Sequence, residues 1–275
     1  MAEQILRIKP ADVVKLIKKG EMEVVSSTTP DSPDRPIPYT RMVERAMDIL
    51  GADFLGVEAI EKMADKLKAV GVNVEFNLGS IPDLPYTEED LQLAKQNGEM
   101  LVLRAGTMTE GTQRPISIIN FRKLFKKDPN GKLETPFYTF RKDANDWYKN
   151  EDFAKKNVEI QPGWSLVKKD FLEDSRNKNW NQQNDILKAY GEELVQTGAT
   201  NIDVRRRTAM EAVWDTMLYY TNTGEHLLER DWDWTSSRAS GGGLVGVGGL
   251  GSYGLYVGLW NPENSRSSLG VCPSR

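Results

Sequence analysis

Apolar positions in the first third of the chain recur with the spacing of helices. Residues 1–20 have the pattern of a charged amphipathic helix, and residues 40–72 carry apolar stripes three or four positions apart: Met42, Ala46 and Leu50, then Val57, Ile60, Met63 and Leu67. Such spacing places side chains on one face of a helix. We therefore predict helices over both segments, with the four prolines of residues 28–38 forming a loop between them.

Local signals predict further elements along the chain. Thr87 and Asp90 have the spacing of a capping box at the start of a helix, and Gly98 is placed to end that helix. The pattern then predicts a strand at residues 100–104, a helix at 115–125, a turn at Asn130 and Gly131, and mixed strands and loops at 135–174. Two longer helices are expected at residues 181–195 and 204–220.

The tail of the chain combines many glycines with a regular apolar pattern. Residues 241–258 contain nine glycines in eighteen positions, and Leu244, Val245 and Val247 stand among them. This alternation predicts a strand with one packed face and a far face that carries almost no side chain, free to accept varied residues. A Gly/Ser linker is the alternative. Residues 246–251 also match G-x-G-x-x-G, but a dinucleotide site needs a following helix, and the residues up to Pro262 are β-like.

Composition narrows the class of protein. The 275 residues are 39% hydrophobic and 28% charged, which is typical of a globular chain, and the net charge of -4 disfavours a nucleic-acid partner. No run of 18 apolar residues and no signal-peptide pattern is present, so we expect neither membrane insertion nor conventional secretion. A virion-borne or a cytoplasmic location remains open.

A shift in composition suggests two regions. Six of the seven tryptophans lie from Trp164 onward, and no lysine follows Lys188. We place the boundary loosely and expect an accessory, mostly helical region at residues 1–110 and a second domain at 111–275 with a distinct tail at 236–275. The fold class expected is α+β.

Few residues offer reactive chemistry. One cysteine, Cys272, and one histidine, His226, exclude an internal disulfide framework and a His-cluster metal centre. We expect a buried thiol and a surface imidazole. Glu225 and Glu229 are expected on a solvated helix end.

Two charged segments leave alternatives open. Residues 205–207 are three arginines, which we expect to be a solvated helix face, with phosphate contact as the alternative. Asp231 and Asp233 flank Trp232 and would share one face of a strand, which leaves a structural calcium site open.

Three segments in fixed order carry a resemblance. They are residues 207–215 (RTAMEAVWD), residues 232–236 (WDWTS), and residues 244–249 (LVGVGG) leading to 269–275 (LGVCPSR). The order resembles the formylglycine-generating-enzyme branch of the C-type lectin fold. That enzyme uses a pair of cysteines to bind copper, whereas this region offers only Cys272, so the resemblance does not extend to the catalytic chemistry.

The tail is more similar to the variable proteins of diversity-generating retroelements, which use a lectin-like scaffold for ligand recognition. The resemblance implies a non-enzymatic protein without a cofactor that binds an unknown protein or glycan, such as one on a host-cell surface, through a hypervariable surface. The ligand-binding positions implied are Ser237, Ala239, Ser240, Gly246, Tyr253, Tyr256, Leu259, Asn264, Arg266 and Ser268. The scaffold would pack on Trp214, Trp232, Trp234, Leu244, Val245, Val247, Val257, Trp260 and Val271. For Trp260, an aromatic that contacts the ligand is the alternative. A formylglycine-generating-type oxidase relative and a structural scaffold protein are the alternatives.

Overall fold

The computed structural model describes residues 41–125, 147–155, 160–200, 202–251 and 254–275. The described residues from Met42 to Arg275 belong to one compact unit, and the fold described below is that of this unit. The helix expected at residues 1–20, the loop at 28–38 and the turn at Asn130 and Gly131 lie outside the described residues.

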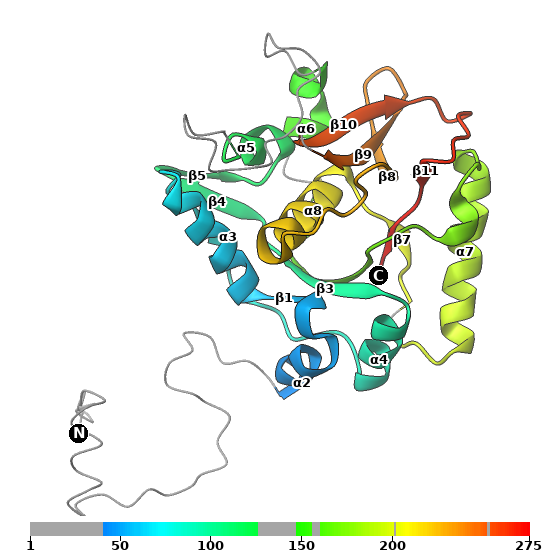
Figure 1. The fold of residues 1–275 in the computed structure, drawn as a ribbon, viewed down its shortest axis with the longest axis horizontal. Helices are drawn as coiled ribbons and strands as arrows, with labels where there is room; N and C mark the ends of the chain where they lie inside the picture. Colours follow the sequence, from blue (N-terminus) through cyan, green and yellow to red (C-terminus); the bar gives the residue numbers. More distant parts are fainter. Residues whose placement is uncertain (1–40, 126–146, 156–159, 201, 252–253) are drawn as a thin grey trace, which may run out of the picture. The chain divides into compact units, whose positions relative to one another are not determined.

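Three sheets are formed by the described residues (Figure 1). The largest contains, in spatial order, β1 (Phe54–Leu55), β3 (Glu99–Arg104), β6 (Gly163–Lys168), β12 (Pro273–Ser274) and β7 (Arg205–Arg206). The second contains β10 (Gly254–Trp260), β9 (Leu244–Gly251), β8 (Trp232–Arg238) and β11 (Leu269–Gly270). The third contains β2 (Glu75–Asn77), β4 (Thr107–Glu110) and β5 (Thr112–Pro115).

The helices surround these sheets, and one lies at the centre. The α-helices are α2 (Arg41–Leu50), α3 (Val57–Ala69), α4 (Glu88–Gln96), α5 (Ile118–Arg122), α6 (Asp152–Lys155), α7 (Trp180–Gln196) and α8 (Ala209–Thr223); the 3-10 turns are η1 (Gly51–Asp53), η2 (Trp147–Asn150) and η4 (Glu173–Ser175). Among the described helices, none combines the length and apolar character that crossing a bilayer requires.

Because the unit contains both helices and sheets, its fold class is α+β.

The central helix is α8, which lies between the five-stranded and four-stranded sheets and also contacts α3 (Figure 1). Twelve of its fifteen residues are buried, as expected of a helix covered on all sides. Trp214 is fully buried on α8, packs edge-on against Phe76 with ring centroids 5.2 Å apart, and donates its indole N–H to the Leu103 carbonyl at 3.1 Å. Through Trp214, α8 thus contacts β3 of the five-stranded sheet and β2 of the three-stranded sheet.

Several predicted elements are confirmed. Thr87 and Asp90 form the capping box of α4, and Gly98 follows that helix with a φ of 66°, which favours glycine. The strand expected at 100–104 is β3, and the helix expected at 181–195 is α7, whose N-cap residue Asn179 forms a second capping box. The helical segment 40–72 is two helices, interrupted by η1 and β1.

Two boundaries are corrected. The helix predicted over 115–125 is only α5, because Pro115 pairs in β5. The helix predicted from residue 204 begins at Ala209, because Arg205 and Arg206 form β7 against β12. The available signal for this start was the capping box of Thr208 and Glu211.

The division of the chain also differs from the boundary expected at residue 110. β1 and β3 come from the segment 1–110, yet β3 pairs with β6 along its whole length in the sheet that holds β7 and β12. Residues 42–110 therefore share one compact unit with the tail.

Candidate functional site

The outer face of the four-stranded sheet is a layer of three aromatic rings over glycines. Strand register places Trp232 and Tyr256 opposite Gly248, and Gly258 opposite Gly246. The Trp232 ring lies 4.7 Å from Tyr256 and 5.8 Å from Trp260, both nearly edge-on. We call Trp232, Tyr256 and Trp260 the aromatic layer, and Gly246, Gly248 and Gly258 the glycine floor. All three rings are half-buried.

The prediction that this glycine face is free to accept side chains is wrong. A β-carbon at Gly246 would lie 2.7 Å from the Trp260 indole nitrogen, and one at Gly258 would lie 3.1 Å from the Tyr256 ring. At Gly248 it would lie 2.0 Å from the backbone oxygen of Asp231. Because rings and neighbouring backbone already fill this space, the glycines are required for packing.

The predicted core of the tail is confirmed for most positions. Trp214 and Trp234 are fully buried, and Trp234 forms a cluster with Leu244 and Leu269. Trp232 and Trp260 pack against that cluster while remaining half-buried. The buried positions also include Val245, Val247, Val257 and Val271.

The expected ligand-binding positions do not share one environment. Ser240, Leu259 and Arg266 are exposed, and Tyr256, Asn264 and Ser268 are half-buried. The prediction that these side chains point to solvent is wrong for three positions that are buried, namely Ser237, Ala239 and Gly246. The Ser237 hydroxyl instead accepts the Ala209 N–H at 2.8 Å at the start of α8. Tyr253 lies outside the described residues.

A groove of about 580 Å³ brings part of the tail together with residues that the sequence did not indicate. Ala239, residues 241–243 and residues 259–262 form one side, and Trp147 and Glu151 form the other. Ser240 ties the two sides, because its N–H and hydroxyl donate to the Glu151 carboxylate at 2.7 and 2.9 Å. Sequence reasoning missed Trp147 and Glu151 because no local pattern links positions 89 residues apart.

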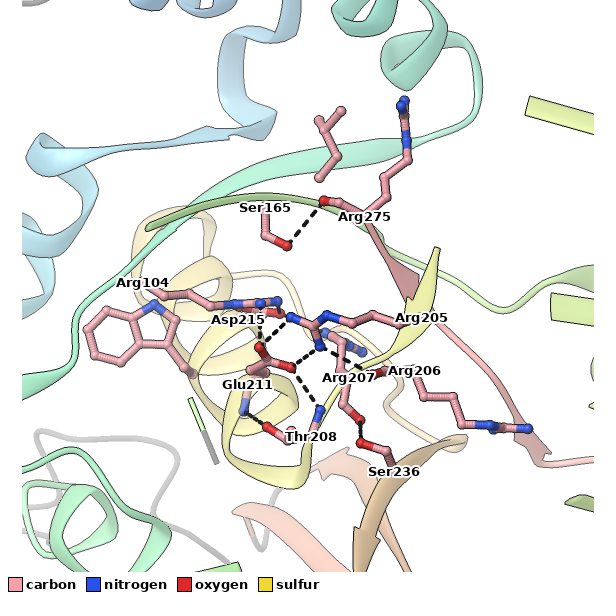
Figure 2. Close-up of polar contacts among 12 residues, drawn as sticks. Arg104, Ser165, Arg205, Arg206, Arg207, Thr208, Glu211, Asp215, Ser236 and Arg275 are labelled. Carbon is pink, nitrogen blue, oxygen red and sulfur yellow. Dashed lines mark hydrogen bonds and ion pairs between the residues drawn. The ribbon is translucent and has the colours of Figure 1, made fainter. Parts of the chain in front are cut away.

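Beside α8 lies a chain of ion pairs among side chains that are all buried except the half-buried Arg205 (Figure 2). Arg104 of β3 contacts Glu211 at 2.9 Å and Asp215 at 2.6 Å, both on α8. Arg207 contacts Asp215 at 3.3 Å and Asp233 of β8 at 2.8 Å. Arg205 completes the chain at Glu211, 2.7 Å away. We call these residues the ion network; its three arginines balance its three carboxylates.

The charges of this network control its protonation. Burial opposes ionisation of Glu211, but the charges of Arg104 and Arg205, with the hydrogen bonds at Thr208 and Arg205, lower its pKa to about 2. Burial raises the pKa of Asp233 despite its contact with Arg207. The arginines around Glu211 therefore hold this carboxylate in its charged form.

The expectation of a solvated arginine face at 205–207 is wrong. Arg206 and Arg207 are buried, and Arg205 is half-buried. The Arg206 guanidinium stacks 3.8 Å from the centre of the Trp180 ring and donates to the Trp234 carbonyl at 2.8 Å. Burial lowers its pKa to about 10. These arginines therefore stabilise the fold through contacts inside the protein.

The two aspartates that left a calcium site open both contact arginines. Asp231 accepts two hydrogen bonds from Arg176 at 3.1 Å, and Asp233 is shared between Arg207 and the Cys272 N–H. A cation would have to displace these partners. No group of three or more potential metal ligands is found in the part of the chain that the structure describes.

The single cysteine and histidine lie as expected. Cys272 is fully buried, and burial, with Asp233 nearby, raises the pKa of its thiol. His226 is exposed and packs its ring against Tyr220 at 4.9 Å. Glu225 and Glu229 are exposed beyond the end of α8.

Comparisons of the chain with protein-family models, with curated proteins and with solved structures gave no match.

The glycine floor predicts a difference between two alanine substitutions in the same tail. Gly248→Ala should destabilise the fold by about 3 kcal/mol, because its β-carbon would overlap backbone that cannot move away easily. Gly241→Ala should change stability by no more than about 0.5 kcal/mol, since nothing lies within 4 Å of its added carbon. Urea denaturation of both variants measures the difference. Equal losses would show that the floor is not tightly packed.

The ion network predicts a pH dependence with a defined sign. Glu211 has a folded pKa of about 2, below its ordinary value of 4.5, so the unfolded chain binds more protons between these values. The contribution of Glu211 to the free energy of unfolding is complete above about pH 4.5 and is lost as the pH falls through 2. Its full size is on the order of 3 kcal/mol.

Glu211→Gln should therefore be less stable at pH 7, by about 3 to 5 kcal/mol. Its free energy of unfolding should also decrease less steeply between pH 4.5 and 2 than that of the unsubstituted chain. Denaturation curves at a series of pH values measure both effects. An unchanged slope in the variant would contradict the ionised state of Glu211.

Proposed function

We propose that this chain is a non-enzymatic ligand- or receptor-binding protein whose C-terminal domain is C-type lectin-like and displays a hypervariable surface generated by a diversity-generating retroelement. The binding surface is the groove between the tail and residues 147–151, together with exposed and half-buried positions of the tail. We call Ser240, Leu259, Asn264 and Arg266 the rim. The ligand is a protein or glycan, such as one on a host-cell surface.

The observation that carries this proposal is that the tail forms one side of the groove, while the strand that leads into the tail, β8, is held in place by a buried ion pair. Ala239 and Leu259, two of the expected binding positions, line the groove, and a third, Ser240, bonds across it. Below them, Asp233 on β8 is fixed to Arg207 inside the protein. A rigid frame under an exposed rim limits the conformational entropy that binding costs.

The spatial grouping of the segments that carry the resemblance also supports a lectin-like domain. Residues 207–215 lead into α8, residues 232–236 lie in β8 and residues 244–249 lie in β9. β8 pairs with β9 and, in parallel, with β11, so these segments form one sheet packed on α8. The segments that carry the resemblance thus contact one another in the folded chain.

The oxidase alternative is less well supported. A copper-binding thiolate must be deprotonated and accessible, whereas Cys272 is fully buried and its pKa is raised by burial. No specific observation among the described residues favours a purely structural role.

The proposal predicts that the rim tolerates change and the frame does not. Replacing Leu259, Asn264 and Arg266 together by alanine should alter stability by no more than about 1 kcal/mol, because these side chains are exposed or half-buried. Trp234→Ala should cost about 3 to 5 kcal/mol, because the ring is fully buried. Comparable losses in the two variants, measured by chemical denaturation, would contradict a variable rim.

A segment exchange tests the function itself. Replacing residues 236–268 by the corresponding segment of a related protein should transfer ligand specificity, whereas replacing residues 1–40 should not. The coding sequence supplies an independent test, because the proposal expects a nearby reverse transcriptase gene and a near-copy of the segment for residues 236–275. Specificity that follows residues 1–40 would overturn the proposal.

A further inference from the structure

Among the residues that the structure describes, no strand pairs with β10 on the side away from β9, and this strand edge borders the groove. β10 is the edge strand of its sheet, and the Val257 carbonyl accepts the Trp147 indole N–H at 2.8 Å. In an antiparallel pair, both backbone groups of one residue point to the same side, and alternate residues point to alternate sides. Since the β10–β9 register is regular from Tyr256 onward, Leu259 directs its N–H and C=O to the same free edge as Val257.

At Leu259 this edge opens into the groove. Trp147 covers the edge at Val257, whereas Leu259 lines the groove and its side chain is 52% exposed. An unpaired N–H and C=O pair at a sheet edge is a template for a further extended chain. The backbone geometry therefore suits a peptide in strand conformation.

The groove also has a single sign of charge. Of the described residues that line it, Glu151 carries the charge, and Ser240 holds both of its oxygens. Each carboxylate oxygen can accept a second hydrogen bond. The carboxylate is thus fixed in place before a ligand arrives, which reduces the entropy lost on binding.

Aromatic walls add to this preference. Trp147 and Trp260 line the groove together with Leu259. Indole rings attract ammonium and guanidinium groups through their π faces. A basic side chain would therefore find a fixed carboxylate and aromatic surface in the same groove.

We propose that the groove binds an extended peptide segment of the partner, which pairs with the Leu259 edge and places a lysine or arginine side chain against Glu151. The inference rests on the function proposed above and specifies its ligand as a protein. A neutral glycan would use the aromatic rings, but it would leave both the strand edge and the fixed carboxylate without their natural partners.

Solution NMR of the full ¹⁵N-labelled chain tests this. The probes are two blocked seven-residue peptides of alternating threonine and serine, one with a central arginine and one with a central glutamine. The arginine peptide should shift the Leu259 amide signal and the indole signals of Trp147 and Trp260. Its affinity should be about tenfold higher than that of the glutamine peptide, as expected for a charge-assisted pair.

Two variants separate the carboxylate from general charge. Glu151→Gln should weaken the arginine peptide about tenfold and leave the glutamine peptide nearly unchanged, so that the two changes are not additive. Glu229→Gln, which alters an exposed carboxylate outside the groove, should affect neither peptide. An arginine peptide N-methylated along its backbone should bind less well, because it cannot donate to the strand edge.

The inference fails if the arginine and glutamine peptides bind equally, if Glu151→Gln has no effect, or if neither peptide shifts these signals at ~5 mM, where even weak contacts are detectable. It also fails if methyl glycosides shift the same signals and the peptides do not. These outcomes leave the proposed function standing as long as exchange of residues 236–268 still transfers specificity.

Discussion

The structure depends on a chain of buried ion pairs that crosses the unit from one sheet to the other. Arg104 in β3 contacts α8 through Glu211 and Asp215, and Arg207 connects Asp215 to Asp233 in β8. Removing one member would leave its partner charged in a medium that solvates charge poorly, which is far more costly than losing an exposed pair. The network therefore fixes the rotation of α8 and the position of β8 together.

A second set of buried charges fixes the other end of the tail. Arg275 contacts Glu99 of β3 at 2.9 Å and Asp90 of α4 at 3.4 Å, and its carbonyl accepts the Leu166 N–H of β6 at 3.0 Å. The segment between β8 and Arg275 is thus held at both ends by the five-stranded sheet and its helices. What lies between them, β9, β10 and their connections, forms the outer sheet and one side of the groove.

Local features were predictable from the sequence, whereas long-range ones were not. The capping box of Thr87 and the alternation of β9 depend on residues close in the chain, so the pattern alone indicates them. The burial of Arg206 and Arg207 depends on acceptors as distant as Trp234 and Asp233. A run of three arginines is typical of solvated surface, and only their partners in space reverse that interpretation.

Only the side of the groove formed by the tail was predictable from the sequence, because the other side joins it through long-range contacts. Ala239 and Leu259 follow from the composition of the tail, but Glu151 joins them only through its hydrogen bonds to Ser240. An available signal for the network was Arg104, a charged residue that directly follows the apolar run at residues 100–103 of β3. Such a residue in a buried strand requires a buried partner, although the sequence does not say which.

The glycine floor determines where variation is tolerated in this domain. Positions of β9 and β10 that face the aromatic layer are closed to larger residues, because a side chain at Gly246, Gly248 or Gly258 would displace a ring or the backbone. The opposite faces of both strands are closed as well, since Val247 and Val257 are buried there. Both faces of the strand centres are therefore constrained, and the positions open to substitution lie at strand ends and connections such as Ser240, Leu259 and Arg266. Under the proposed function, a surface of that size offers few side chains for contact, so affinity would come from a small number of anchors and from a groove already formed before binding.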